Sequence, residues 1–381
     1  MTKRLLIITR HIISQNNGGA NATKGFIHCF AAIFKDCTLI CPAFEGKATD
    51  FIPSNVNVIT YEDCRTRVRK GLDCWRGRIC ANEPLVKEHL KEHRYDVIVI
   101  DHSFSGASLV KAIKESRAKI ITIHHNVERN YNKDNKKSIP IACRFPYVYF
   151  ANKAERDCLA LSDINLTLTE QDASVFRTWG FKERVHYWGT FEYRQIVDKT
   201  FANGNKNMTF AITGSLCFEQ SVFPILDFIK NYWPLVLNEY PKSQLIIAGR
   251  NPNEKLIKIC AHTSSIVLIP NPEWIDSVIK DATYYICPIN AGSGLKLRVM
   301  DGLKQGKLVL CHKVSSAGYE ELEKKDCLFV YSNKVTFIEA LHTMLAKIPA
   351  PEHVYHSFRM AFSLETGIKR LDDILRKERI I

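Results

Sequence analysis

The sequence predicts an α/β protein with two domains, each built around a parallel β-sheet. Short apolar runs recur along all 381 residues and alternate with amphipathic helical segments, as βαβ units require. The alternation fades over residues 194–207 (RQIVDKTFANGNKN) and then begins again, so we place a linker there. A length of 381 residues is sufficient for two separate hydrophobic cores.

Composition limits the class of protein and of partner. The chain is 46% hydrophobic and 24% charged, which is typical of a globular protein, and no apolar run is long enough to span a bilayer. The net charge of +13 indicates an anionic partner: nucleic acid, a phosphorylated substrate or a membrane surface. The thirteen cysteines show neither C-x-x-C nor zinc-ligand spacing, which favours a reducing cytoplasm and predicts no metal site. Since Arg10 and His11 end the first apolar run, we interpret that run as a strand and not as a signal peptide.

In the first half, a glycine loop follows the first strand. Gly18 and Gly19 lie in this loop, and an apolar helix is predicted after it at 24–34. Such a loop brings backbone N–H groups to the carboxyl edge of a sheet, where α/β proteins bind ligands. The strands predicted in this half are residues 4–9, 38–41, 56–60, 95–100, 119–123 and 161–169.

Polar residues follow two of these strands. Asp101-His102-Ser103 ends the strand at 95–100, and His124-His125-Asn126 ends the strand at 119–123. A single histidine in such a place is most often a hydrogen-bonded structural residue, but two strand ends carrying histidines favour a substrate pocket. We take His102 and His124 as the candidates.

Two segments mix cationic and aromatic residues. Residues 65–80 contain six Lys or Arg with Leu72, Trp75 and Ile79 between them, and residues 129–150 combine lysines with phenylalanine and tyrosine. A solvated charged face is one interpretation, and contact with anionic lipid is the other.

The second half repeats the alternation. The strands predicted there are residues 209–213, 244–248, 266–269, 284–287, 308–310 and 328–331. A turn at Gly214-Ser215 follows the first of them, leading to a helix that extends to Leu237 through Trp233-Pro234. A loop at 270–274 leads to a helix ending at Asp281, and a C-terminal helix closes the chain.

The segment from Tyr284 to Gly318 has the chemistry of an anion site. After the strand at 284–287, the turn Gly292-Ser293-Gly294 leads into a helix predicted at 295–304. Glycines let the backbone approach a ligand, and a helix N-terminus carries partial positive charge. Lys296 and Arg298 add full charges, and Asp301 could accept hydrogen bonds from ribose hydroxyls. A glycine turn with solvated cations is the alternative, and GSGLKL fits neither the G-x-G-x-x-G nor the Walker pattern.

Several sequence segments of the second half resemble family 4 glycosyltransferases of the GT-B fold, which build bacterial cell-surface polysaccharides. These segments are Phe210 to Leu216, Trp233-Pro234, Leu245 to Arg250 and Pro288 to Val309. The resemblance is strong from about residue 208 to 315 and looser over the first half, where Gly18-Gly19 and residues 123–128 contribute.

The resemblance implies two Rossmann-like domains facing across a cleft. It places an acceptor-binding domain at 1–195, a nucleotide-sugar-binding domain at 196–355, and a helix at 356–381 that packs back on the first domain.

The resemblance also implies roles for residues. Lys296 and Arg298 would hold the diphosphate, His102 or His124 would face the donor sugar, and Asp301 would take the ribose position. The donor-binding set would be Gly18, Gly19, Gly214, Ser215, Asn271, Gly292, Ser293, Gly294, Leu295 and Asp301.

The sequence departs from the family pattern in three ways. Asp301 stands for the usual Glu, Ala291 lies near the place of another Glu, and Ser215 and Gln220 replace the usual Arg and Lys. An inactive relative is therefore an open alternative.

We therefore expect a retaining, metal-independent glycosyltransferase that uses a nucleotide-diphosphate sugar and no cofactor. The expected acceptor is a lipid-linked or lipopolysaccharide or capsule oligosaccharide, reached from the cytoplasm at the inner face of the plasma membrane. An epimerase-like GT-B enzyme is the main alternative. A nucleic-acid-binding protein is disfavoured, because no helix-turn-helix, RRM-like or zinc pattern is present.

Overall fold

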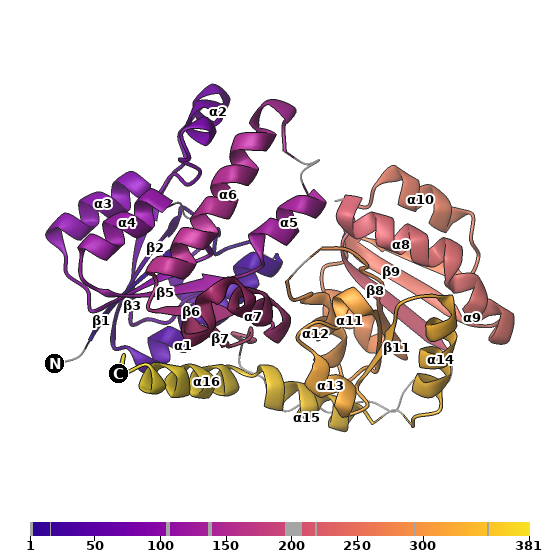
Figure 1. Cartoon of the computed structure of the whole chain (residues 1–381). Helices are drawn as coiled ribbons and strands as arrows, with labels where there is room; N and C mark the ends of the chain where they lie inside the picture. Colours follow the sequence, from indigo (N-terminus) through magenta and orange to yellow (C-terminus); the bar gives the residue numbers. More distant parts are fainter. Residues whose placement is uncertain are drawn as a thin grey trace. The chain divides into compact units, whose positions relative to one another are not determined.

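The computed structural model describes residues 3–15, 17–103, 107–135, 139–194, 208–217, 219–292, 294–348 and 350–381. The chain forms two compact units (Figure 1). The first unit comprises Met1–Ile196, Gly292–Gly294 and Phe362–Ile381, and the second comprises Val197–Ala291 and Leu295–Ala361. Most of the predicted linker at 194–207 lies outside the described residues.

The first unit contains a seven-stranded, fully parallel sheet with the order β3-β2-β1-β4-β5-β6-β7. Buried Leu, Ile and Val side chains fill its central strands, as expected for a sheet covered on both faces. Its strands are β1 (Arg4–Thr9), β2 (Asp36–Pro42), β3 (Val56–Tyr61), β4 (Val97–Asp101), β5 (Lys119–His124), β6 (Ile164–Thr167) and β7 (Val185–Tyr187).

Helices connect these strands, and the last helix of the chain joins them. In this unit α16 packs on α1, and the indole Nε1 of Trp188 donates a hydrogen bond to the Gly367 carbonyl at 3.0 Å. The helices are α1 (Gly18–Ile33), α2 (Arg67–Trp75), α3 (Glu83–Glu92), α4 (Ala107–Glu115), α5 (Glu128–Asn135), α6 (Ile141–Leu161), α7 (Glu170–Phe176) and α16 (Leu364–Lys377).

The second unit contains a six-stranded parallel sheet with the order β10-β9-β8-β11-β12-β13. Its strands are β8 (Thr209–Ser215), β9 (Gln244–Arg250), β10 (Ile266–Pro270), β11 (Tyr284–Cys287), β12 (Val309–His312) and β13 (Leu328–Tyr331). Its helices are α8 (Glu219–Asn231), α9 (Trp233–Glu239), α10 (Glu254–Ala261), α11 (Ile275–Asp281), α12 (Arg298–Leu303), α13 (Glu320–Lys324), α14 (Lys334–Leu345) and α15 (Pro351–Phe362).

Both sheets reverse their strand order at one point. In the first unit the reversal falls between β1 and β4, and in the second it falls between β8 and β11. Ligands of doubly wound sheets bind beside the carboxyl ends of the strands at such a point. The loops after these four strands are therefore where each unit would hold a ligand.

The prediction of two parallel-sheet α/β domains is confirmed, and most predicted strands lie within two or three residues of their observed bounds. The strand predicted at 161–169 is too long, because α6 continues to Leu161 and β6 begins only at Ile164. The strand β7 was not predicted.

Four helix boundaries differ from the prediction. Helix α1 begins at Gly18, because the side chain of Asn17 caps it by accepting the Ala20 N–H at 3.0 Å. The helix expected to run to Leu237 is broken before Trp233, since Pro234 favours a new first turn. Helix α12 begins at Arg298 and not at Leu295, and Ser363 separates α15 from α16 within the expected C-terminal helix.

All thirteen cysteines are free and nine are buried, so most act as small apolar side chains. No helix in the described part of the chain is both long enough and apolar enough to cross a membrane.

Candidate active site

The strand order of the first unit brings three polar side chains together. His11 follows β1, Asp101 ends β4 and His125 follows β5, and these strands are neighbours in the sheet. Because Thr9 pairs with Asp101 in the register of β1 and β4, the carboxyl ends of both strands lie level. The site is therefore built at the point where the strand order reverses.

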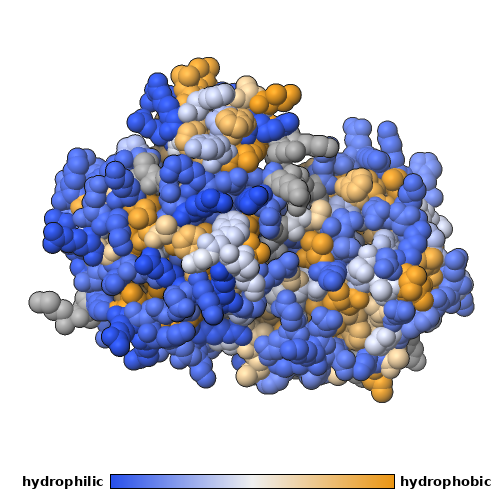
Figure 2. Space-filling view, in the orientation of Figure 1, coloured by the Kyte–Doolittle hydropathy of each residue, from blue (hydrophilic) through white to orange (hydrophobic). Residues whose placement is uncertain are grey.

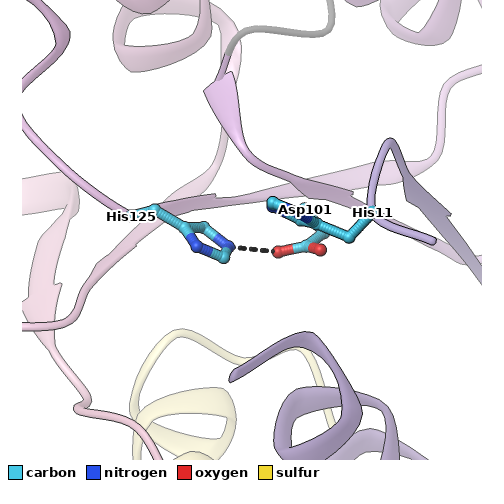
Figure 3. Close-up of side chains that lie close together, drawn as sticks. All are labelled: His11, Asp101 and His125. Atoms are coloured by element: carbon cyan, nitrogen blue, oxygen red, sulfur yellow. Dashed lines mark hydrogen bonds and ion pairs between the residues drawn. The ribbon is translucent and has the colours of Figure 1, made fainter. Parts of the chain in front are cut away.

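Asp101 is the centre of this group. Its Oδ1 lies 2.7 Å from His125 Nε2, and its Oδ2 accepts hydrogen bonds from Thr9 Oγ1 at 2.7 Å and Thr23 Oγ1 at 2.6 Å. Figure 3 shows the His125 ring directed at the carboxylate, with His11 beside it. The ring centroids of His11 and His125 are 5.1 Å apart. Asp101 is 1% exposed, so this network takes the place of water.

The network keeps the carboxylate ionised. Burial by itself would raise the pKa of Asp101, but His125, His11 and the Thr23 hydroxyl outweigh burial and lower that pKa to about 2. Burial also lowers the pKa of His11 to about 3, with a further contribution from His125. His11 is therefore neutral near pH 7, and its Nε2 has no hydrogen-bond partner among the described residues.

Gly19 leaves room for the His11 ring. A Cβ at this position would lie 2.4 Å from His11 Cε1, so no larger residue fits without moving the ring. Gly18 is the first residue of α1. The predicted role of both glycines in donor binding stays a prediction, but the packing of His11 already explains the glycine at position 19.

His102 adopts a rare backbone conformation beside this cluster. Its φ of 81° lies in the left-handed region, which is unusual for a residue with a side chain. Its Nε2 is 3.5 Å from Glu128 Oε1, and its ring lies 5.1 Å from that of His125. Such an outlier supports the hypothesis of a functional role.

Glu128 and Glu155 form a buried carboxyl pair next to His102. Their exposures are 2% and 1%, and Glu155 Oε1 accepts the Glu128 N–H at 2.6 Å at the start of α5. Burial raises the pKa of Glu128 to about 7, with Arg10 and His125 opposing it. Burial and the charge of Glu128 raise the pKa of Glu155 to about 8, against the backbone hydrogen bonds that it accepts. Both carboxyls therefore titrate near neutral pH.

Glu155→Gln is expected to weaken the dependence of stability on pH. The folded protein retains a proton on Glu155 that the unfolded chain releases above about pH 4.5, so the free energy of unfolding falls as the pH rises towards 8. Glutamine keeps an oxygen to accept the Glu128 N–H but has no such proton. Between pH 5 and pH 8 the variant should gain more than about 1 kcal/mol relative to wild type in urea unfolding. An unchanged pH dependence, matching that of the exposed-site control Glu88→Gln, would contradict this.

His124 lies inside the first unit. It is fully buried, its Nε2 lies 2.9 Å from Asn165 Oδ1, and its ring packs on Phe176. Burial lowers its pKa to about 4, despite the hydrogen bond to Asn165. These contacts fit a structural histidine.

The ligand atoms of His11, Asp101 and His125 lie within 4.8 Å of one another, so these residues could hold a divalent metal. Both oxygens of Asp101 already accept hydrogen bonds, however. The carboxylate is thus satisfied by the protein itself.

In the second unit, Arg298 lies at the carboxyl end of β8. Its Nη2 donates to the Ser215 carbonyl at 3.0 Å and to Ser221 Oγ at 2.8 Å, while its buried Nη1 has no partner among the residues that the structure describes. A Cβ at Gly214 would lie 2.3 Å from the guanidinium carbon. The guanidinium therefore lies at the carboxyl end of β8, and its Nη1 is left to donate to a further acceptor such as an anion.

Gly214→Ala is expected to displace Arg298 and to weaken nucleotide binding at least ~10-fold. The added Cβ would collide with the guanidinium, and the φ of 137° at this position disfavours any side chain. Gly180→Ala is a matched control, because Gly180 also has a positive φ but no atom lies within 4 Å of its Cβ position. If both variants bind the nucleotide with equal affinity in calorimetric titration, nucleotide binding does not depend on the space above Gly214.

The remaining predicted residues of this site have the following places. Lys296 precedes α12, and its carbonyl accepts the Tyr319 hydroxyl at 3.0 Å. Leu295 precedes α12 and is partly buried. Asp301 Oδ1 is 3.3 Å from Lys304 Nζ; burial raises the pKa of this carboxyl, and Lys304 opposes the shift. Since α12 has only six residues, its dipole adds little charge.

Asn271 adopts a φ of 50°, and its Oδ1 accepts the Asn251 N–H at 2.8 Å, so it stabilises the turn after β9. Gly292 and Gly294 have φ values of 90° and 73°, which explains their identity, and they group with the first unit. Ser293 lies outside the described residues.

Sequence reasoning did not select four residues of the first unit as site residues: His11, Asp101, His125 and Glu128. Their shared signal is a polar side chain within a few residues of the end of an apolar run. This signal becomes specific only once β1, β4 and β5 are known to be neighbours.

The architecture is that of GT-B proteins. Anabaena Alr3699/HepE, solved in complex with UDP and glucose, aligns with a TM-score of 0.67 at 10% identity, over 98% of this chain and 99% of that one. Sucrose-phosphate synthase from Thermosynechococcus elongatus aligns at 0.68 with 12% identity over 98% of both chains. A UDP-forming trehalose-phosphate synthase from Burkholderia vietnamiensis aligns at 0.64 with 12% identity, over 99% of this chain and 100% of that one.

A family model also matches part of the chain. Residues 17–191 match the model described as Glycosyltransferase Family 4, so this part of the first unit is similar in sequence to that family. An "Uncharacterized 44.6 kDa protein in cps region" of Klebsiella pneumoniae is 21% identical over 236 residues. That match spans 59% of this chain and 59% of the Klebsiella relative.

Proposed function

We propose that the protein transfers a sugar from a nucleotide-diphosphate sugar to the acceptor of a bacterial cell-surface polysaccharide. The family 4 match and the GT-B fold support glycosyl transfer, and relatives solved with UDP or UDP-glucose support a nucleotide donor. The cps region of the Klebsiella relative supports a role in polysaccharide synthesis.

One observation carries the mechanism: the Arg298 guanidinium at the end of β8, with a buried N–H that has no partner in the described part of the chain. When the bond between sugar and diphosphate breaks, negative charge develops on the diphosphate. Fixed positive charge stabilises that charge without a metal. Arg298 binds the diphosphate in this proposal, and Lys296 adds a second charge.

In this proposal, residues of the first unit bind the sugar that is transferred. His102 and the Asp101–His125 pair would hydrogen-bond to its hydroxyl groups, and we favour His102 over His124 because His124 is fully buried. By resemblance the reaction is retaining, and it needs no protein nucleophile. The acceptor we propose is a lipid-linked or lipopolysaccharide or capsule oligosaccharide.

The test combines donor screening with product analysis. A panel of nucleotide sugars is first ranked by thermal stabilisation, because a ligand that binds only the folded state raises its apparent stability. The best donor is then incubated with lipid-linked oligosaccharide acceptors, with and without EDTA. Acceptor-dependent transfer that survives EDTA is the expected result. Donor turnover without an acceptor would instead favour an epimerase-like enzyme, and the absence of any stabilisation would indicate an inactive relative.

A further inference from the structure

Helices α2 and α6 of the first unit carry a row of exposed apolar side chains each. We call the three exposed residues of α2 (Val68, Leu72 and Trp75) and the three of α6 (Ile141, Phe145 and Tyr149) the α2–α6 surface. Figure 2 shows hydrophobic side chains gathered over these helices. The exposed fractions are 74% for Val68, 50% for Leu72, 58% for Trp75, 83% for Ile141, 75% for Phe145 and 54% for Tyr149.

The spacing shows that each row is one helix face. Val68, Leu72 and Trp75 are separated by four and three residues along α2, and the α6 residues recur every four. The opposite face of α2 packs on α6: Cys74 is 8% exposed, and its Sγ donates to the Cys143 carbonyl at 3.9 Å. The exposed rows are thus the outer faces of a packed helix pair.

Unpaired positive charge accompanies these rows. Arg67, Arg76 and Arg78 are exposed and form no ion pair with other described residues. The nearby Asp63 and Asp73 instead pair with the other cations of the segment, Arg65, Arg69 and Lys70. From residue 139 to 154 the sequence contains no Asp or Glu. The surface is therefore apolar and cationic at once.

A hollow of about 550 Å³ lies on the outer side of α6. Phe145 and Tyr149 stack within it, with ring centroids 6.2 Å apart. The Nε of Arg144 is buried there and has no partner within the described ranges, although its Nη2 donates to the Ile139 carbonyl at 3.4 Å. The lining residues are Ile141, Arg144, Phe145, Val148, Tyr149 and Asn152.

We propose that the α2–α6 surface docks on an anionic lipid bilayer. Aromatic and aliphatic side chains enter the headgroup region, while arginines neutralise lipid phosphates. A protein partner would also cover apolar residues. The three unpaired arginines, however, match anionic lipid headgroups, and the open aromatic hollow matches the acyl chains beneath them. The inference deepens the proposed function, because a lipid-linked acceptor would be reached at such a surface. Docking itself, however, requires neither donor nor acceptor.

The experiment is co-sedimentation of the full-length protein with vesicles of phosphatidylcholine alone or mixed with phosphatidylglycerol. Two triple variants test the two parts of the surface: Trp75→Ser with Phe145→Ser and Tyr149→Ser, and Arg67→Gln with Arg76→Gln and Arg78→Gln. We expect binding to the mixed vesicles only, weakening as salt rises. Each triple variant should lower the affinity roughly 10²-fold.

Matched controls use the second unit. Phe223→Ser with Val335→Ser removes equally exposed apolar residues, and Lys255→Gln with Lys258→Gln and Lys280→Gln removes equally exposed charge. These variants should bind like wild type. Equal binding by all variants, or equal binding to neutral vesicles, would overturn the proposal. So would a triple variant that changes the oligomeric state but not vesicle binding, which would indicate an interface between copies. Vesicle binding without sugar transfer would instead disprove only the proposed function.

Discussion

Replacement of Arg298 by alanine lowers turnover at least ~10²-fold in our account, because the developing charge on the diphosphate loses its fixed counter-charge. The side chain enters the site from the first turn of α12 and rests on Gly214. The same substitution with Lys296→Ala should lower turnover further. Both effects should appear in kcat and not only in KM, since the interaction strengthens as the bond breaks.

Controls separate this electrostatic effect from damage to the fold. Arg298→Lys keeps the charge but not the two hydrogen bonds, so an intermediate loss is expected. Lys258→Ala, on an exposed face of α10, should leave turnover unchanged. If Arg298→Ala remains folded and as active as wild type, Arg298 is not part of the mechanism.

Asp101→Asn should reduce both stability and activity. Asparagine has nearly the same shape, but one carboxylate oxygen becomes an N–H group, so one of the three hydrogen bonds now accepted at this position is lost. Leaving one of these buried donors without an acceptor costs about 1–3 kcal/mol. The proposed contact of His125 with the sugar would also be disturbed, and turnover should fall by ~10² at temperatures where the variant is folded.

The lowered pKa of Asp101 predicts how the stability difference between wild type and Asp101→Asn changes with pH. Because the pKa of Asp101 is lowered to about 2 from the usual 3.8 of an aspartate, its contribution to stability is present above about pH 4 and is lost as the pH falls towards 2. The difference between wild type and Asp101→Asn in urea unfolding should therefore shrink over that range. Asp36→Asn, in the half-exposed pair with Arg4, is the control and should cost less than about 1 kcal/mol. Equal losses for the two variants would contradict a central role for Asp101.

The strand β5 and the two histidines at its end show how much of the fold and of the site the sequence could predict. Apolar runs located β5 almost to the residue, and the polar sequence after it was correctly interpreted as the end of a strand. Periodicity could not decide between His124 and His125. Successive side chains of a strand point to opposite faces, and only the structure shows that His124 packs against Phe176 and Asn165 while His125 contacts Asp101.

The sequence also could not predict which residues far apart in the chain become neighbours in the fold. His11 and Asp101 are 90 positions apart, and they meet only because β1 pairs with β4 rather than with β3. Arg298 was selected from its place after the glycine turn. Its contact with Gly214 depends on β8 lying beside β11, which local patterns do not show.

The most direct test of the central claim compares how tightly wild type and Arg298→Ala bind nucleoside diphosphates and monophosphates of the same base. If Arg298 holds the second phosphate, wild type should prefer the diphosphate by at least ~10-fold, and the variant should bind both nucleotides about equally. A preference for the diphosphate that is as large in Arg298→Ala as in wild type would contradict the account.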